Sequence, residues 1–163
     1  MSEKKKILFV CLGNICRSAA AEAIMKKTVA DAGLSEQFEI DSAGILNYHE
    51  GEPADRRMRE HARIHGYDVD SISRPVKAID FDRFDLIIGM DNNNIDDLHD
   101  RAQTIEHVKK IHAMREYFTE GTQEDYVPDP YYGGAAGFEL VISLLEDGCK
   151  NLLHSIQEQN NRL

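Results

Sequence analysis

Cys11 and Arg17 stand six residues apart, between a predicted strand and a predicted helix. Residues 7–10 are apolar and rich in strand formers, and a run of strong helix formers begins at Ala19. A tight turn between them points backbone N–H groups and the positive end of the helix dipole into one small volume, which suits a phosphate dianion. That field favours a thiolate, and an arginine fork binds two phosphate oxygens. The spacing therefore predicts a Cys11 nucleophile inside a phosphate-binding turn, with Arg17 as its clamp.

Asp129 is a second candidate for chemistry. It lies between Pro128 and Pro130, which restrict the backbone and hold the carboxylate in an extended, rather rigid loop. The leaving oxygen of a phosphate ester departs more easily when it receives a proton, and Asp129 is the predicted donor. The alternative is a surface turn, because Pro-Asp-Pro suits turns well. The phosphate-binding turn favours the acid, which would later act as a base on the hydrolytic water.

The sequence at residues 10–18, VCLGNICRS, resembles the signature of the low-molecular-weight protein tyrosine phosphatases. Further matching segments follow in order over nearly the whole chain, at residues 41–44 (DSAG), 65–66 (HG), 89–91 (GMD) and 127–132 (VPDPYY). Ala19 departs from the family, which usually has proline there, but alanine is acceptable in the first turn of a helix. The resemblance implies hydrolysis of phosphotyrosine in proteins or peptides. Because the turn already supplies positive charge, we expect no cofactor and no metal, and we expect phosphate or vanadate to inhibit by competing at the turn.

The phosphate-binding loop is predicted to comprise Leu12, Gly13, Asn14, Ile15, Cys16 and Ser18. Ser18 can donate a hydrogen bond to the sulfur of Cys11. Cys16 could capture an oxidised Cys11 as a disulfide or could simply pack beneath the loop. The resemblance implies that Asn14, Ser42 and His65 support the shape of the loop.

Three tyrosines are candidates for an aromatic rim around the pocket: Tyr48, Tyr131 and Tyr132. Tyr48 stands where the family commonly carries an aromatic residue. Two glycines follow the other two tyrosines, so an incidental surface position is the alternative interpretation. A rim would favour the long, flat side chain of phosphotyrosine over that of phosphoserine.

Three other functions stay open. Arsenate reductases share the fold implied by the resemblance, but they need extra cysteines near the third strand, and residues 80–92 contain none. Protein arginine phosphatases also resemble the chain, but they usually carry threonine where Ile15 stands. A non-catalytic phosphotyrosine-binding module is disfavoured because Cys11, Arg17 and Asp129 are all present.

The chain of 163 residues is one domain by length, covering residues 1–163, with a net charge of -10. A nucleic-acid partner would want a basic face, so this charge argues against one. The apolar run after Lys6 ends at Leu12, too soon for an export segment or a membrane span. Three cysteines without a paired framework fit a reducing cytoplasm, and Cys149 is expected to be buried. We expect a cytoplasmic monomer that binds neither nucleic acid nor membrane.

The alternation of strand and helix patterns predicts a three-layer α/β/α fold, with a four-stranded parallel sheet and the phosphate-binding turn after the first strand. The expected strands cover residues 7–10, 38–43, 84–90 and 107–112, and the expected helices cover residues 17–32, 53–65, 92–101 and 137–159. Asp91 is the predicted cap of the third helix.

Several acidic residues and histidines are predicted to bind no metal. Asp80, Asp82 and Asp85 are expected to form a solvated acidic face. His61 and His65 have the i, i+4 spacing of a zinc-protease helix, but no glutamate follows His61. His61 is therefore expected to be solvated.

Overall fold

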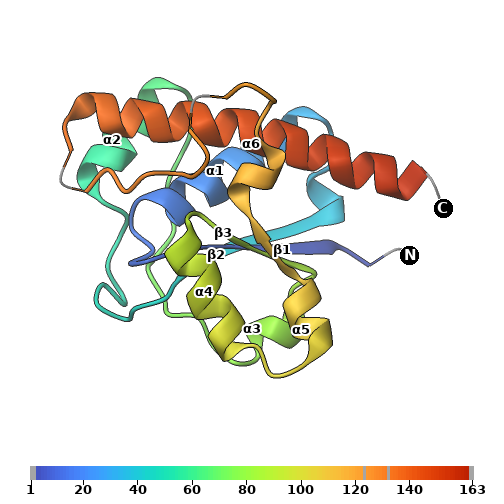
Figure 1. Ribbon diagram of the computed structural model, residues 1–163. Helices are drawn as coiled ribbons and strands as arrows, with labels where there is room; N and C mark the ends of the chain where they lie inside the picture. Colours follow the sequence, from blue (N-terminus) through green and yellow to red (C-terminus); the bar gives the residue numbers. More distant parts are fainter. Residues whose placement is uncertain (1–2, 123, 132, 162–163) are drawn as a thin grey trace.

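The sheet has four parallel strands, as a computed structural model of the protein shows for residues 3–122, 124–131 and 133–161. The strands are β1 (Lys5–Cys11), β2 (Phe38–Gly44), β3 (Leu86–Gly89) and β4 (Ile111–Ala113), in the spatial order β2-β1-β3-β4 (Figure 1). Val10 of β1 pairs with Ala43 of β2 and with Gly89 of β3. Several strands thus end at one edge, where parallel sheets bind ligands.

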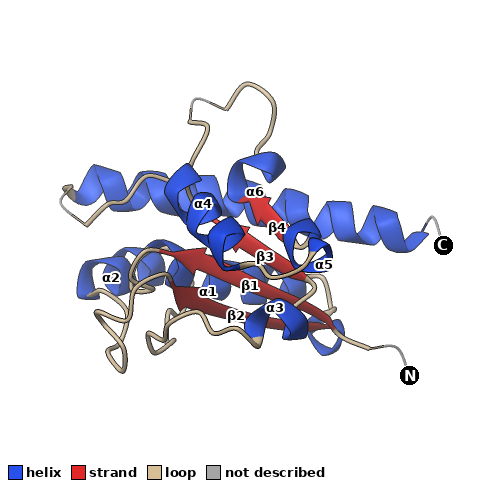
Figure 2. Ribbon diagram, turned by 60° about the horizontal axis from the view of Figure 1, so that its bottom comes forward, coloured by secondary structure: helices blue, strands red, loops and turns tan. Residues whose placement is uncertain are grey.

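Helices cover both faces of the sheet (Figures 1 and 2). One side carries α1 (Arg17–Asp31), α2 (Arg56–Ile64) and the long α6 (Ala135–Asn161), and the other carries α3 (Asp80–Arg83), α4 (Asn92–Arg101) and α5 (Ile105–Lys109). Short 3-10 turns follow α1 and β4, at Ser35–Gln37 and Met114–Tyr117. The predicted three-layer α/β/α fold is confirmed. Within the described ranges, no helix is long and apolar enough to cross a membrane.

The central strand β1 contributes to two hydrophobic cores, because successive side chains of a strand point to opposite faces. Ile7 and Phe9 belong to the cluster on the α1–α6 side. Leu8 and Val10 belong to the cluster on the α3–α4 side. All four side chains are fully buried, so β1 is anchored from both sides just before the phosphate-binding turn.

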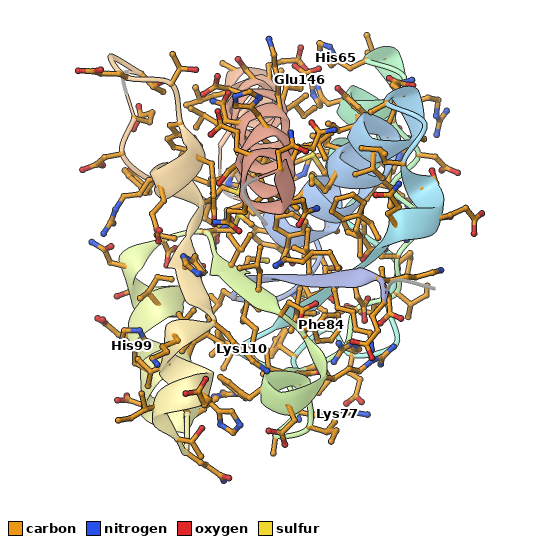
Figure 3. The ribbon with its side chains drawn as sticks, turned by 90° about the vertical axis from the view of Figure 1, so that its right-hand side faces the viewer. His65, Lys77, Phe84, His99, Lys110 and Glu146 are labelled. Atoms are coloured by element: carbon orange, nitrogen blue, oxygen red, sulfur yellow. The ribbon has the colours of Figure 1, made fainter. Side chains whose placement is uncertain are left out.

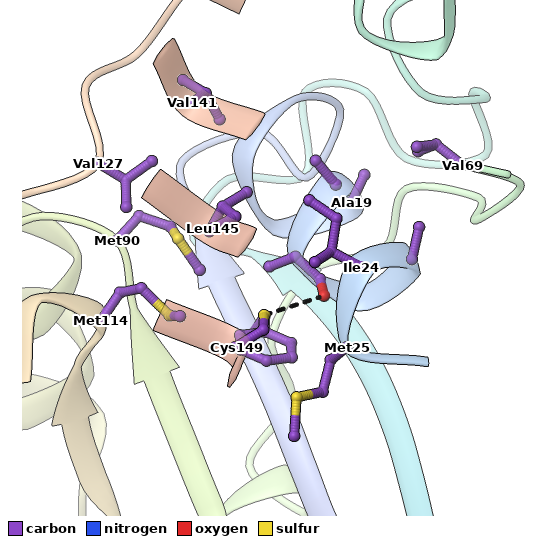
Figure 4. Close-up of a cluster of buried hydrophobic side chains, with 14 of the residues drawn as sticks. Ala19, Ile24, Met25, Val69, Met90, Met114, Val127, Val141, Leu145 and Cys149 are labelled. Atoms are coloured by element: carbon purple, nitrogen blue, oxygen red, sulfur yellow. Dashed lines mark hydrogen bonds between the residues drawn. The ribbon is translucent and has the colours of Figure 1, made fainter. Parts of the chain in front are cut away.

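The core between the sheet and α6 is the larger of the two. Figure 4 shows part of it. It includes Ile24, Met25, Val141, Leu145 and Cys149. The sulfur of Cys149 lies 3.9 Å from the carbonyl oxygen of Ala21, which confirms the predicted burial of this cysteine between α1 and α6. Phe84 fills the opposite core, on the other side of the sheet from Glu146 of α6 (Figure 3). Burying each large apolar side chain contributes roughly 1.5–3 kcal/mol.

Two predicted elements differ from the structure. The second helix begins at Arg56 rather than at Pro53, because the carboxylate of Asp55 caps it by accepting from the backbone N–H of Arg57 at 2.8 Å. The predicted strand at residues 107–112 is wrong in its first half. Thr104 caps the short helix α5 there, and β4 covers only three residues. The bounds of the remaining predicted elements lie within two residues of those observed.

The acidic face is confirmed only in part, because Asp80 is not solvated. Asp80 is 2% exposed and accepts hydrogen bonds from two guanidinium nitrogens of Arg74 and from the backbone N–H of Lys77. Buried carboxylates need such partners, and Arg74 supplies the charge. Asp82 and Asp85 are exposed as predicted. In the ranges that the structure describes, no group of three or more His, Cys, Asp or Glu side chains could hold a metal ion.

Candidate active site

The loop between β1 and α1 lies at the carboxyl edge of the sheet, where the sequence predicts the phosphate-binding turn. This loop forms one wall of a cavity of about 290 Å³. The cavity is lined by Cys11, Leu12, Gly13, Ile15, Cys16, Arg17, Leu46, Tyr48, His49, Asp129 and Tyr131. The fold therefore brings the predicted nucleophile, clamp and acid to one pocket, although they come from opposite ends of the chain.

Cys11 ends β1 with only 2% of its surface exposed. Its sulfur lies 3.0 Å from Oγ of Ser18 and 3.3 Å from the backbone nitrogen of Asn14, which donates to it. Ser18 belongs to the first turn of α1, so the positive end of that helix faces the same region. Hydrogen bonds and a helix dipole both favour negative charge on the sulfur. The predicted contact between Ser18 and Cys11 is present.

Asn14 holds the loop in an unusual backbone conformation. Its φ of 58° lies in the left-handed region, which costs a residue with a side chain about 1–2 kcal/mol. Its amide nitrogen donates to Oγ of Ser18 at 2.8 Å and to Oγ of Ser42 at 2.9 Å. Its amide oxygen accepts from the backbone N–H of Arg74 at 3.0 Å. These three hydrogen bonds offset the strain and hold the loop open for an anion.

Glu22 orients this network, and sequence reasoning missed it. It is 5% exposed, and its two oxygens accept from Oγ of Ser42 and Nζ of Lys26, both at 2.6 Å. A carboxylate can only accept, so the Ser42 hydroxyl donates to Glu22 and accepts from Asn14. Asn14 also donates to Ser18, which leaves the hydroxyl hydrogen of Ser18 available for the sulfur. The sequence offered one signal for this role, because Glu22 is a single carboxylate among the apolar residues of the first turns of α1.

Arg17 is almost completely buried, at 3% exposed, and its guanidinium is held from two sides. Nη1 donates to Oδ2 of Asp91 at 2.6 Å and to the carbonyl oxygen of Val127 at 3.1 Å. Burial opposes its charge, but the neighbouring Cys11 and Asp91 outweigh that and raise the pKa of Arg17. Asp91 also caps α4, as predicted, but its contact with Arg17 was not predicted.

Asp129 stands at the mouth of the cavity with 44% of its side chain exposed. Its Oδ1 accepts from the backbone N–H of Tyr131 at 3.0 Å, and its Oδ2 lies 3.7 Å from Nη2 of Arg17. The segment before it is fixed to the end of β3, because the backbone N–H of Val127 donates to the carbonyl of Met90 at 2.9 Å. The carboxyl group of Asp129 can therefore face a ligand that is bound in the cavity above the sulfur of Cys11.

The family model for the low molecular weight phosphotyrosine protein phosphatases matches residues 6–162. The chain belongs to this family. Its members are hydrolases, so the chain is an enzyme of the protein-tyrosine-phosphatase class.

Relatives of this phosphatase come from bacteria and eukaryotes. A low molecular weight protein-tyrosine-phosphatase of Streptomyces coelicolor is 40% identical over 155 residues, covering 94% of each chain. A protein tyrosine phosphatase of Entamoeba histolytica, solved with Hepes in the active site, has 50% identity and a TM-score of 0.93, and the match covers 96% of this chain and 99% of that one. The Drosophila arginine phosphatase has 32% identity and a TM-score of 0.86, over 93% and 97% of the two chains.

The rim of the phosphatase pocket contains two of the three predicted tyrosines, and Tyr132 lies outside the described residues. Tyr48 is 82% exposed, and its ring meets His49 edge-on with centroids 5.1 Å apart. The rings of His49 and Tyr131 are 6.4 Å apart. His49 thus lies between the two tyrosines, and its place in the rim was not predicted. Exposed Leu46 adds apolar surface to the same wall.

His65 does not support the phosphate-binding loop, so that expectation is wrong. Its Nε2 lies 2.8 Å from Oε1 of Glu139, in the layer of α2 and α6 (Figure 3). His61 is not simply solvated either, because its Nδ1 lies 2.9 Å from Oε2 of Glu139 and its ring stacks on Phe138 at 5.5 Å. The two histidines share one face of α2, and that face is turned toward α6 rather than toward the loop.

Residues that follow His65 in the chain support the loop instead. Oγ of Ser73 donates to the carbonyl oxygen of Gly13 at 2.9 Å, and Arg74 donates its backbone N–H to Asn14. Ser42, which was expected to support the loop, accepts from the side-chain amide of Asn14 at 2.9 Å. The support therefore comes from the end of β2 and from residues 73–74, which run alongside it through a bridge between Gly44 and Pro75.

Proposed function

We propose that this phosphatase hydrolyses phosphotyrosine in proteins or peptides through a cysteinyl-phosphate intermediate. The observation that carries the proposal is the convergence of Cys11, Arg17 and Asp129 on one cavity. The sulfur has hydrogen-bond donors at 3.0 and 3.3 Å, and the buried guanidinium stands beside it. A substrate with a compact anionic group and a leaving atom that accepts a proton uses all three groups at once.

In the first step, the Cys11 thiolate attacks phosphorus in line with the ester oxygen. The S–P bond forms, the bond from phosphorus to the phenolic oxygen breaks, and Asp129 gives its proton to that oxygen. Arg17 and the N–H groups of the loop bind the other three phosphate oxygens, where negative charge is spread in the transition state. The proposed step requires that Asp129 carry a proton before the attack.

In the second step, water attacks the phosphorus of the cysteinyl-phosphate, and Asp129 takes its proton. The S–P bond breaks, inorganic phosphate forms, and Cys11 leaves as a thiolate. The hydroxyl of Ser18 and the N–H of Asn14 stabilise the charge that returns to the sulfur. Asp129 and Cys11 end in their starting protonation states, so the cycle closes.

The preference for phosphotyrosine is supported by the depth of the sulfur and the aromatic rim. Cys11 is 2% exposed while Tyr48 is 82% exposed, so a substrate must reach past the rim to meet the sulfur. A phosphotyrosine ring can do so between aromatic side chains, each contact contributing about 0.5–1.5 kcal/mol. Phosphoserine is short, and its own backbone would meet the rim first.

Protein arginine phosphatase activity is the second candidate, because the Drosophila arginine phosphatase shares the fold at 32% identity. Ile15 lines the cavity and is 9% exposed. Its branched apolar side chain offers no hydrogen bond to a guanidinium, and an unpaired polar group is costly to bury. An arsenate reductase is less well supported, because Cys149 packs between α1 and α6, away from the cavity.

Measuring kcat/KM for matched peptides that carry phosphotyrosine, phosphoserine or phosphoarginine tests the proposal. We expect wild type to favour phosphotyrosine over both, and Ile15→Thr to shift the balance toward phosphoarginine. If wild type hydrolyses phosphoarginine as well as phosphotyrosine, the substrate assignment is wrong. Turnover of p-nitrophenyl phosphate separates an enzyme from a binding module.

The proposed chemistry requires no metal, because the loop and Arg17 supply the positive charge. Excess EDTA should therefore leave the rate unchanged, whereas vanadate and inorganic phosphate should compete with substrate for the loop. Activity that returns only after adding zinc, magnesium or manganese would contradict this part of the proposal.

A further inference from the structure

Arg57, in the first turn of α2, connects the segment that carries Asp129 to the body of the enzyme. Its Nη2 donates to the backbone carbonyl oxygen of Tyr131 at 2.8 Å. The same guanidinium donates to both carboxylate oxygens of Asp55, from Nε at 3.2 Å and from Nη2 at 3.0 Å. A planar fork bound in this way has a defined orientation.

Asp55 is in turn attached to the phosphate-binding loop. Its backbone N–H donates to the carbonyl oxygen of Ile15 at 2.8 Å, within the loop itself. Burial alone would raise the pKa of Asp55, but the hydrogen bonds and charge of Arg57 outweigh it and lower that pKa. Asp55 therefore stays charged at neutral pH and gives Arg57 a fixed anchor beside the loop.

At the other end, Arg57 holds the residue that orients the carboxyl of Asp129. Tyr131 donates its backbone N–H to Oδ1 of Asp129 at 3.0 Å and gives its carbonyl oxygen to Arg57. The guanidinium carbon also lies 5.4 Å from the centre of the Tyr131 ring and 4.9 Å from that of Phe138. Tyr131 is thus held through both its backbone and its ring.

These contacts form one continuous path from the phosphate-binding loop to the carboxyl group of Asp129. The path runs through Ile15, Asp55, Arg57 and Tyr131. Asp129 itself is 44% exposed and lies 3.7 Å from Arg17, so its position depends on Tyr131 and on the groups that hold Tyr131. A general acid must lie within hydrogen-bond reach of the leaving oxygen, and small displacements reduce catalysis strongly.

We propose that Arg57 is a positioning residue that sets Asp129 at the correct distance from the phosphorus bound at Cys11. This inference rests on the proposed function, because it requires Asp129 to act as the general acid. Arg57 touches neither the substrate nor the reacting atoms in this scheme. It acts through the backbone of Tyr131.

The neighbouring Arg56 provides a matched control. Its side chain is 82% exposed, and its Nε pairs with Glu60 at 3.0 Å on the surface of α2. Arg56→Ala removes the same charge from the same helical turn without touching the 129–131 segment. We therefore expect Arg56→Ala to leave the kinetics unchanged.

The test compares kcat/KM for two substrates. Phenyl phosphate releases phenolate, a poor leaving group, and p-nitrophenyl phosphate releases p-nitrophenolate, a good one. Arg57→Ala should lower kcat/KM about tenfold for phenyl phosphate and less than about threefold for p-nitrophenyl phosphate, because only the first depends strongly on the proton from Asp129. Arg57→Lys keeps the charge but loses the fork, so it should recover only part of the loss. In an Asp129→Ala background, Arg57→Ala should cause no further loss on phenyl phosphate.

An equal loss for both substrates, or a loss that adds to that of Asp129→Ala, would overturn the inference and leave only a structural role for Arg57. The thermal midpoint of each variant is measured alongside, and Arg57→Lys serves as the test variant if Arg57→Ala fails to fold. If Asp129→Ala alone leaves kcat/KM for phenyl phosphate at the wild-type value, the proposed function is refuted instead. The two failures are therefore distinguishable.

Discussion

Oδ2 of Asp91 accepts a hydrogen bond of 2.6 Å from Nη1 of Arg17, while Oδ1 of the same carboxylate caps α4. One acidic residue at the end of β3 therefore anchors a helix and orients the guanidinium proposed to bind phosphate. Arg17 is 3% exposed, so a partner with the opposite charge is needed to keep it buried.

Replacing Asp91 with asparagine isolates the charge of this pair. Asparagine is as good an N-cap as aspartate, so α4 should persist, but the neutral amide no longer compensates Arg17. We expect kcat/KM for p-nitrophenyl phosphate to fall about tenfold. Asp96→Asn, on the exposed surface of α4, is the control. Equal activity of the two variants would contradict an orienting role for Asp91.

Replacing the three proposed catalytic residues should give three different outcomes. Cys11→Ser should abolish turnover, because a serine hydroxyl is almost wholly protonated at neutral pH. Arg17→Lys should cost several kcal/mol of transition-state stabilisation, since a lysine lacks the bidentate fork. Asp129→Ala should affect aryl phosphates with poor leaving groups far more than those with good ones. Equal losses on both substrate types would remove Asp129 from the acid role.

Oxidation by peroxide should begin at Cys11 rather than at Cys16. Burial raises the pKa of the Cys16 thiol well above its usual range, so Cys16 is not the reactive thiolate of the pair. We predict that peroxide converts Cys11 to a sulfenic acid. Attack by the sulfur of Cys16 would then form a disulfide and release water, whereas a Cys16 that merely packs beneath the loop would give no such disulfide. Thiols then restore activity. Mass spectrometry and recovery assays check this, and a Cys16→Ser variant that recovers as fully as wild type would refute the protective role.

The pair of His65 and Glu139 should make stability depend on pH. The hydrogen bond to Glu139 raises the pKa of His65, and the hydrogen bonds from His65 and His61 lower the pKa of Glu139. The contribution of His65 to the stability of the folded protein is complete below its unfolded pKa of about 6.5. It is lost as the pH rises through the higher pKa of the folded state. The Glu139 contribution is complete above its unfolded pKa of about 4.3 and is lost at lower pH.

The two contributions therefore overlap between about pH 4.3 and pH 6.5. Within that window, His65→Gln should lower the thermal midpoint by roughly 1–3 °C, and the difference from wild type should shrink at alkaline pH. His154→Gln removes an i, i+4 pair with Glu158 on the exposed end of α6 and serves as the control. Melting curves of both variants across this pH range test the prediction. If the difference between His65→Gln and wild type does not change with pH, the pair of His65 and Glu139 does not make stability depend on pH.

The phosphate-binding turn was predictable from sequence because its physics is local. A buried strand ends at Cys11 and a helix begins at Arg17, and this alone directs the N–H groups and the dipole toward Cys11. The alternation of apolar runs also predicted the layers and the parallel sheet. The error at residues 107–109 has a local cause as well, since the Thr104 cap began a short helix within an apolar pattern that suited a strand.

Contacts between distant segments were decided only by the tertiary structure. Glu22 reaches Ser42 because α1 packs beside β2, and residues 73–74 reach Asn14 by running along the end of β2. Neither relationship leaves a periodic signal in the sequence, since it depends on which segments the fold places side by side. His65 illustrates this, because the family resemblance suggested a place beside the loop, whereas the packing of α2 against α6 turned it toward Glu139.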